Sequence, residues 1–178
     1  MGYSGGTKKH PTYHSLGDHT EVVRIRYDPH KIDFNTLLSI FWKNHNPSIT
    51  YQKQYWSIIF YQNENQKSIA QESLQVLRTT SMNETHTKII PFHKFFPAEN
   101  YHQKYILQTH PWLVAAMKIE SGEELIKSHV CTKMNGFLAG YGELDELSEA
   151  GKGLGLNEKM VEYVSVQMKK SAIQNKPC

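Results

Sequence analysis

The sequence predicts an α/β fold, a two-layer sandwich in which helices pack on a mixed sheet, followed by a helical C-terminal extension. Over residues 1–110, short runs of β-branched and aromatic residues alternate with longer segments of helical periodicity. This alternation is typical of helices packed on a sheet. From residue 111 onward the periodic segments are helical. We therefore predict a core over residues 1–110 and a helical extension over residues 111–178.

The strands of this sheet are predicted from residue type and alternation, and they fall at residues 22–27, 54–61 and 87–92. The first run ends in the turn signal Asp28-Pro29 and is predicted to be a core strand. In the second run, Tyr55 and alternate residues after it share one face. Residues 1–10 contain a Gly-Gly pair and are predicted to form a loop.

The helices are predicted from apolar residues at helical spacing and from capping residues. Asp33 is a predicted N-cap for a helix to about residue 44, and Asn63 for a helix to about residue 78. Pro111 suits the first turn of a helix. The last helix is predicted over residues 156–170, with its apolar side formed by Met160, Val161, Val164 and Met168.

Composition excludes several classes of function. The chain has 20 Lys and Arg residues against 17 Asp and Glu residues, and they are scattered, which argues against binding to nucleic acid. No apolar run approaches the length needed to cross a membrane. The first ten residues lack the hydrophobic segment of a signal peptide. We expect a protein that is not bound to a membrane and is located in the cytoplasm; any transit peptide would lie upstream of residue 1.

Cysteine and histidine usage limits the chemistry. The two cysteines, Cys131 and Cys178, are far apart, which excludes a disulfide scaffold and any CxxC motif. The ten histidines do not form a metal-binding pattern, so no metal and no bound cofactor are expected. Cys131 lies among apolar and small residues and is predicted to be a small buried hydrophobe. Cys178 ends a polar tail, where its thiol is chemically available.

Polar groups are concentrated just before the first predicted strand. Tyr13, Asp18, His19 and Glu21 lead directly into it. Burying Glu21 as an anion would be costly, so this carboxyl group is solvated, paired, or kept partly protonated for use as an acid.

Several of these stretches match one family in order and in spacing. They are MGYSGG, PTY, GDHTEVVRIRYDP, LLSIFWKNHNP, QYWSIIFY and FFPAENYHQKY. With them the sequence resembles the A-type peptide methionine sulfoxide reductases over about residues 2–108. The remainder, with NGFLAGYG and the terminal Cys178, resembles the longer insect-type members.

The resemblance implies a chemistry and assigns residues to it. A cysteine thiolate attacks the sulfur of methionine-(S)-sulfoxide, in proteins or as the free amino acid, while a carboxylic acid protonates the oxygen and tyrosine hydroxyls stabilise it. Glu21 matches the acid, and Tyr13 and Tyr55 match the hydroxyl donors. Cys178 matches the resolving thiol, which forms a disulfide that thioredoxin or another dithiol reduces. The implied protein is a monomer whose partners are sulfoxide-containing proteins and thioredoxin.

The sequence also departs from the family pattern. The family's attacking cysteine lies in a Gly-Cys-Phe-Trp motif on a strand before the GYxGG loop, and this motif is absent here. We therefore expect a chain shortened at its N-terminus, with a sheet edge left exposed. The loop before QYW also lacks an acid found in many members. Two alternatives stay open: a catalytically dead module that binds sulfoxide peptides or a partner, and a chain in which Cys131 or Cys178 replaces the nucleophile.

Overall fold

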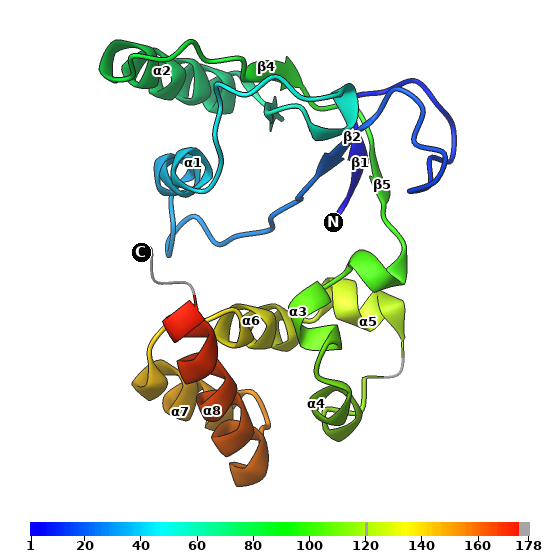
Figure 1. Ribbon diagram of the computed structural model, residues 1–178, viewed down its shortest axis with the longest axis vertical. Helices are drawn as coiled ribbons and strands as arrows, with labels where there is room; N and C mark the ends of the chain where they lie inside the picture. The colour runs from blue at the N-terminus through cyan, green and yellow to red at the C-terminus, as the bar shows by residue number, and fades with distance from the viewer. Residues whose placement is uncertain (120, 175–178) are drawn as a thin grey trace. The chain divides into compact units, whose positions relative to one another are not determined.

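The computed structural model describes residues 1–119 and 121–174, and the chain divides into two compact units between Ala98 and Glu99 (Figure 1). The division falls earlier than the boundary predicted after residue 110. Two short elements after Ala98, η2 (Asn100–His102) and α3 (Tyr105–Gln108), pack against helices of the second unit. Leu107 is fully buried there, and its N–H donates to Asn135 Oδ1 at 3.1 Å.

The first unit contains a three-stranded antiparallel sheet with the order β2-β1-β5. Its strands are β1 (Gly2–Ser4), β2 (Thr20–Val22) and β5 (Phe95–Pro97). Tyr3 on the central strand lies opposite Glu21 and Phe96, and its side chain is buried. The prediction of a loop over residues 1–10 is therefore wrong at residues 2–4. Pairing on both edges and burial of Tyr3 outweigh the local turn signal of the glycines.

The predicted core strand over residues 22–27 is also wrong in extent and in burial. The strand ends at Val22, and Val23 and Ile25 are 66% and 57% exposed. The physical reason is the lack of a partner. The ladder with β1 ends where Gly2 faces Val22, and no strand in the described part of the chain pairs with residues 23–27.

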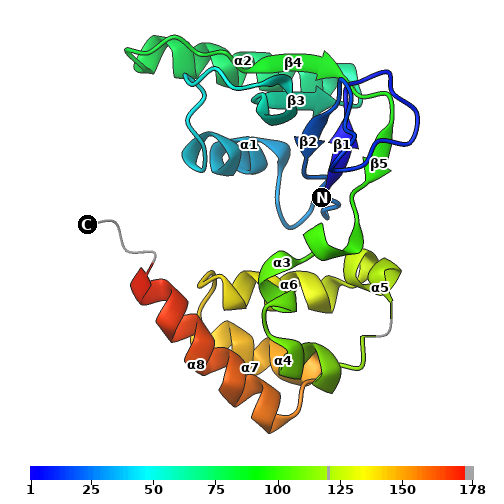
Figure 2. The same ribbon diagram turned by 45° about the vertical axis from the view of Figure 1, so that its right-hand side comes forward.

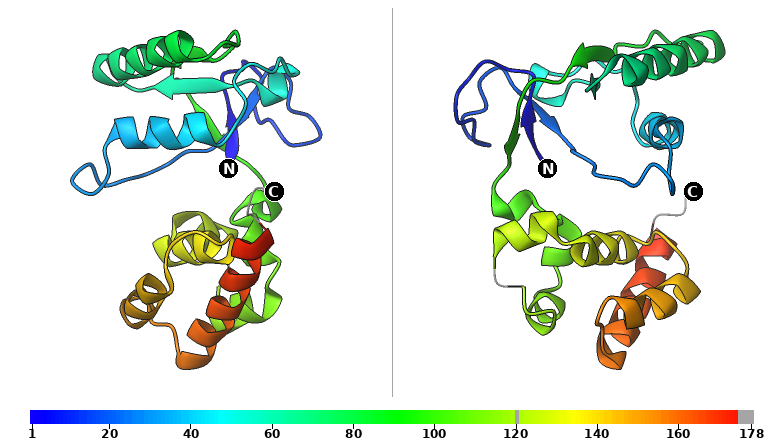
Figure 3. Two further views of the ribbon diagram at one scale, coloured as in Figure 1. Left: turned by 60° about the vertical axis from the view of Figure 1, so that its left-hand side comes forward. Right: turned by 180° about the vertical axis from the view of Figure 1, so that it is seen from behind.

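A second, parallel sheet is formed by β3 (Ile58–Tyr61) and β4 (Lys88–Pro91), which are joined through α2 (Glu64–Thr80). Helix α1 (Phe34–Lys43) lies beside α2, where Trp42 Nε1 donates to Ser73 Oγ at 3.2 Å. Figure 3 shows both helices next to β3. The buried side chains at this junction are Leu38, Ile59 and Ala70. The helices, strands and mixed pairing agree with the predicted α/β class.

Both predicted N-caps in this unit are confirmed. The side chains of Asp33 and Asn63 accept hydrogen bonds from the N–H groups of Thr36 and Gln66, at 2.7 and 2.9 Å. The predicted strand over residues 54–61 is confirmed only in its second half. Its beginning is a 3-10 turn, η1 (Lys53–Tyr55), which contains Tyr55.

The second unit is helical. After η2 and α3 it contains α4 (Pro111–Ala116), α5 (Gly122–Lys127), α6 (His129–Leu138), α7 (Leu144–Gly153) and α8 (Glu158–Gln174). Figure 2 shows α8 beside α7 and α6, on which it packs. Pro111 occupies the first turn of α4, as predicted. The predicted apolar side of the last helix is confirmed by burial of Met160, Val164 and Met168. Within residues 1–119 and 121–174, no helix has the length and apolar character needed to cross a membrane.

Candidate active site

Glu21 and Tyr55 lie near each other because a side chain of β2 binds the backbone of η1. Thr20, which is buried, donates its hydroxyl to the Lys53 carbonyl oxygen at 2.7 Å. The residues that follow these two, Glu21 on β2 and Gln54 on η1, are then in contact. Gln54 Nε2 donates to Glu21 Oε1 at 2.6 Å. Glu21 is half-buried, so its carboxyl group is held by an amide donor and is still reachable from solvent. Of the three states left open by the sequence, the structure shows a hydrogen-bonded carboxyl group.

The phenol of Tyr55 lies close enough to the Glu21 carboxyl group to feel its charge, and Tyr13 lies beside Tyr55. The side chains of Tyr13 and Tyr55 are 38% and 50% exposed and share a hydrogen bond. Partial desolvation raises the pKa of the Tyr55 phenol, and the Glu21 charge and Tyr13 add to this. Tyr55 therefore stays protonated at neutral pH and keeps a hydroxyl proton to donate. The structure thus brings together three of the four residues that the sequence assigned to the site, and Cys178 lies outside the described residues.

A loop clamp fixes the segment between these residues and β1. Both carboxylate oxygens of Asp18 accept from the Thr7 N–H, at 2.8 and 2.9 Å, and the Lys8 N–H donates to Oδ1 at 3.2 Å. The Thr7 hydroxyl donates to Oδ2. These hydrogen bonds, with the Thr7 N–H first, lower the pKa of Asp18 to about 2. Asp18 is therefore a positioning residue, which holds the loop as a carboxylate.

His19 completes the clamp from the other side. Its ring is buried, its Nδ1 accepts from the Gly6 N–H at 3.1 Å, and its Nε2 lies 2.8 Å from the Lys8 carbonyl oxygen. Since a carbonyl can only accept, Nε2 carries the proton and the imidazole is neutral. Both ring nitrogens of His19 are engaged in hydrogen bonds to the backbone, so His19 is not a base for the site.

We expect Asp18→Asn to loosen this clamp. Because the pKa of Asp18 is lowered in the folded state, its contribution to stability is complete above its ordinary value of 3.8 and is lost as pH falls through about 2. Hydrogen exchange at the Thr7 and Lys8 amides measures this. At pH 5 the variant should lose protection several-fold, and below about pH 2 variant and native chain should become alike. Equal protection at pH 5 would contradict the assignment.

Gln54 and Thr20 are the residues of this site that sequence reasoning missed. Each donates a side-chain hydrogen bond to a residue 33 positions away in the sequence, Thr20 to Lys53 and Gln54 to Glu21. QYW lies in a stretch that is predicted to be strand throughout, so the sequence did not indicate the turn η1, from which Gln54 binds Glu21. The only signal in the sequence was that Gln54 directly precedes Tyr55.

The sequence singled out one other thiol, Cys131, and its side chain lies in the core of the helical unit. It is fully buried on α6 among apolar side chains that include Met134 and Leu138. This confirms the prediction of a small buried hydrophobe. A thiol so enclosed cannot reach a substrate, which argues against Cys131 as a replacement nucleophile.

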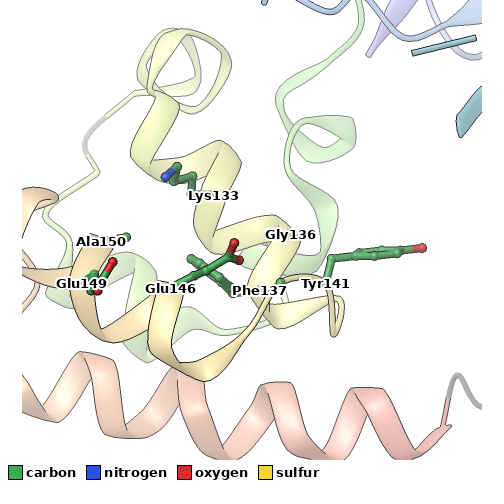
Figure 4. A pocket seen from close by; sticks show the side chains of 8 residues that line it. Lys133, Gly136, Phe137, Tyr141, Glu146, Glu149 and Ala150 are labelled. Atoms are coloured by element: carbon green, nitrogen blue, oxygen red, sulfur yellow. The ribbon is translucent and has the colours of Figure 1, made fainter. Parts of the chain in front are cut away.

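A separate pocket of about 450 Å³ lies in the helical unit, between α6 and α7 (Figure 4). Phe137 forms part of its wall, and Lys133 lies at its edge. Glu146 is committed to the N-terminus of α7, since its Oε2 accepts from the Glu143 N–H at 3.1 Å. The Tyr141 side chain points away from the other side chains (Figure 4). None of the predicted site residues lines this pocket, and in the described part of the chain no three His, Cys, Asp or Glu side chains are grouped to hold a metal ion.

The fold and the cluster together define an α/β protein that carries a carboxyl group and two phenols at one half-exposed point. Such a site can protonate and hydrogen-bond an oxygen atom that gains charge. Comparison with known proteins identifies the family. Residues 1–134 match the family model described as peptide methionine sulfoxide reductase.

Relatives carry the same name. A "Peptide methionine sulfoxide reductase" of Drosophila melanogaster is 38% identical over 181 residues, covering all of this chain and 73% of the fly protein. A "Peptide methionine sulfoxide reductase A5" of Arabidopsis thaliana is 38% identical over 146 residues, or 78% of this chain and 57% of the plant protein. The rice protein of that name is 35% identical and is covered over 58% of its length. The chain thus belongs to the peptide methionine sulfoxide reductase family of oxidoreductases. It spans between 57% and 73% of the length of these three relatives.

Proposed function

We propose that residues 1–98 supply the oxygen-binding half of a site that reduces methionine-(S)-sulfoxide in proteins and as the free amino acid. The observation that carries this proposal is the proximity of Tyr55 to the Glu21 charge, together with the hydrogen bond between Tyr55 and Tyr13. Glu21 is the general acid for the sulfoxide oxygen, and the two phenols donate hydrogen bonds to it.

The electronic demand of the reaction supports these roles. As a thiolate attacks the sulfoxide sulfur, electron density moves to the oxygen, which becomes more basic and a stronger acceptor. Donors already aimed at that point gain strength in the transition state and need no reorganisation. Tyr55, whose raised pKa keeps it protonated, meets this requirement. The Gln54 amide, bound to Glu21 Oε1, orients the carboxyl group so that its other oxygen can carry the proton.

The attacking thiolate has to come from a residue other than those in the first unit. Residues 1–98 contain no cysteine, and Cys131 is enclosed in the helical core. In the proposed reaction the thiolate comes from the family's Gly-Cys-Phe-Trp strand, and Cys178 keeps the resolving role that the resemblance assigns to it. The thiolate of that strand attacks the sulfoxide sulfur and the oxygen is protonated. The sulfur–oxygen bond of the sulfoxide then breaks, the oxygen ends as a hydroxyl on the cysteine sulfur, which becomes a sulfenic acid, and methionine is released as the thioether.

Regeneration requires a reductant from outside the chain. Cys178 is the proposed resolving thiol, which condenses with the sulfenic acid to a disulfide and releases water. Thioredoxin, or a small dithiol in its place, then reduces the disulfide. No bound cofactor is needed, because the two electrons come from thiols.

The proposal is tested with two versions of the protein, the 178-residue chain and the same chain extended by the family's Gly-Cys-Phe-Trp strand. With dithiothreitol as reductant, the extended chain should reduce a methionine-(S)-sulfoxide peptide and leave the (R) epimer unchanged. Replacing the added cysteine by serine is the matched control and should abolish turnover. An extended, folded chain that reduces neither epimer would refute the proposal.

A second candidate function is favoured by the lack of cysteine in residues 1–98. The 178-residue chain itself would then bind a sulfoxide peptide or a partner protein without turning it over. Isothermal titration separates this candidate from the first. Binding of the (S)-sulfoxide peptide in preference to the thioether peptide, with no methionine formed under dithiothreitol, would support a binding module.

A further inference from the structure

The methionines of this chain differ sharply in exposure. Met82 is fully exposed, whereas Met134, Met160 and Met168 are buried in the helical core. Met1 lies between these extremes at 41% exposure. A peroxide must reach the thioether sulfur to oxidise it, so exposure decides which methionine reacts.

Met82 is held at a fixed bend and is not on a loose end. On one side, Ser81 caps α2, where its N–H donates to the Leu77 carbonyl oxygen at 2.8 Å, and its hydroxyl accepts from the Asn83 N–H at 3.2 Å. On the other side, Thr85 is buried and the His86 N–H donates to the Pro47 carbonyl oxygen at 2.9 Å. The side chain between these anchors is therefore presented to solvent, and the next two residues, Asn83 and Glu84, are also exposed.

We propose that Met82 is an oxidation site of this protein, and that its sulfoxide is a substrate for the reductase site of a second molecule that carries the Gly-Cys-Phe-Trp strand. The second half of this proposal rests on the proposed function. In the oxidation, the thioether sulfur attacks hydrogen peroxide or an organic peroxide. A sulfur–oxygen bond forms, the oxygen–oxygen bond breaks, and the released oxygen takes up a proton and leaves as water or an alcohol.

The reduction returns the Met82 sulfoxide to the thioether. A thiolate attacks the Met82 sulfoxide sulfur, the oxygen passes to the cysteine as a sulfenic acid, and the thioether is restored. Two dithiol sulfurs then reduce the sulfenic acid to the thiol and release water. The peroxide is the oxidant and the dithiol is the reductant over the whole cycle.

The geometry points to a second molecule as the enzyme, because Met82 cannot reach the site of its own chain. The segment between its anchors, Ser81 and Thr85, spans at most about 14 Å when fully extended. Helix α2, at whose end it lies, has 17 residues and is about 25 Å long. Figure 1 shows the loop after α2 on the side of the unit away from β2 and η1, where Glu21 and Tyr55 lie.

Oxidation at this position is compatible with the folded state. The Met82 side chain is fully exposed and lies outside all three hydrophobic clusters, so a polar sulfoxide there displaces no packed core side chain. The same change at Met134, which is fully buried in the helical core, would place a sulfoxide among apolar groups. Met82 can therefore cycle between its two oxidation states while the chain stays folded.

The first experiment treats the native 178-residue chain with limiting hydrogen peroxide and follows each methionine by peptide mapping. Met82 should be oxidised at least about tenfold faster than the three buried methionines, which serve as internal controls, with Met1 intermediate. In Met82→Leu the rates at the other positions should be unchanged. Equal rates at Met82 and Met134 in the folded chain would overturn the proposal.

The second experiment offers the peroxide-treated chain, freed of peroxide, to the extended chain described above with dithiothreitol. Peroxide gives both sulfoxide epimers at an open site, so reduction of Met82 sulfoxide should stop at about half. The rate should rise in proportion to the concentration of the extended chain. A free (S)-sulfoxide peptide is assayed in parallel. If the peptide is reduced and Met82 sulfoxide is not, the inference fails and the proposed function stands. If neither is reduced, the proposed function fails.

Discussion

Glu21→Gln in the extended chain should lower kcat for the (S)-sulfoxide peptide by about 100-fold or more. Removing a positioned general acid typically costs a factor of about 10² to 10⁴. Glutamine keeps the shape of the side chain and an oxygen that can accept from Gln54. The decrease in kcat therefore reports the loss of the acidic proton and not a change in shape. Steady-state kinetics with dithiothreitol measures it.

The matched control is Glu72→Gln, on the exposed face of α2 in the same unit, where the carboxylate accepts a surface hydrogen bond from Ser68 at 3.0 Å. Its kcat should equal that of the parent. A Glu21→Gln protein that binds substrate and turns over within a factor of about three of the parent would remove Glu21 from the role of acid.

Val164→Ala in α8 should destabilise the helical unit by about 2 kcal/mol. Val164 is fully buried against the cluster that includes Leu138 and Leu147. Two methyl groups are removed, and the surrounding helices can close the space only in part. Urea unfolding of the full chain, followed by far-ultraviolet circular dichroism, measures the change.

Val166→Ala provides the control, because it makes the same chemical change two residues further along the same helix. Val166 is 45% exposed, so its replacement should change the free energy of unfolding by no more than about 0.5 kcal/mol. Equal effects of the two substitutions would mean that α8 does not pack with the face described.

The parts of the fold that depend on local chemistry were predictable from sequence. Asp33 and Asn63 cap helices through bonds to N–H groups three residues on, and this signal needs no knowledge of the rest of the chain. The burial of Met160, Val164 and Met168 follows from helical periodicity over several turns.

The parts that depend on distant partners were not predictable. Strand β1 has only three residues, too few for alternation to show, and it exists because β2 and β5 pair with it. Residues 23–27 have strand composition without a partner, and composition alone does not make a ladder. In the site, Glu21, Tyr13 and Tyr55 were named through family resemblance. The bond from Thr20 to Lys53 that joins them crosses 33 positions and leaves no local pattern.

The central claim is that the two phenols beside Glu21 act on the sulfoxide oxygen. The most direct test is kcat of the extended chain carrying Tyr13→Phe or Tyr55→Phe, with Tyr51→Phe as the control on a neighbouring exposed tyrosine. We predict that each of the first two lowers kcat at least about tenfold, as expected for loss of a donor that acts in the transition state, and that the third leaves it unchanged. Parental kcat in both Tyr13→Phe and Tyr55→Phe would contradict the account.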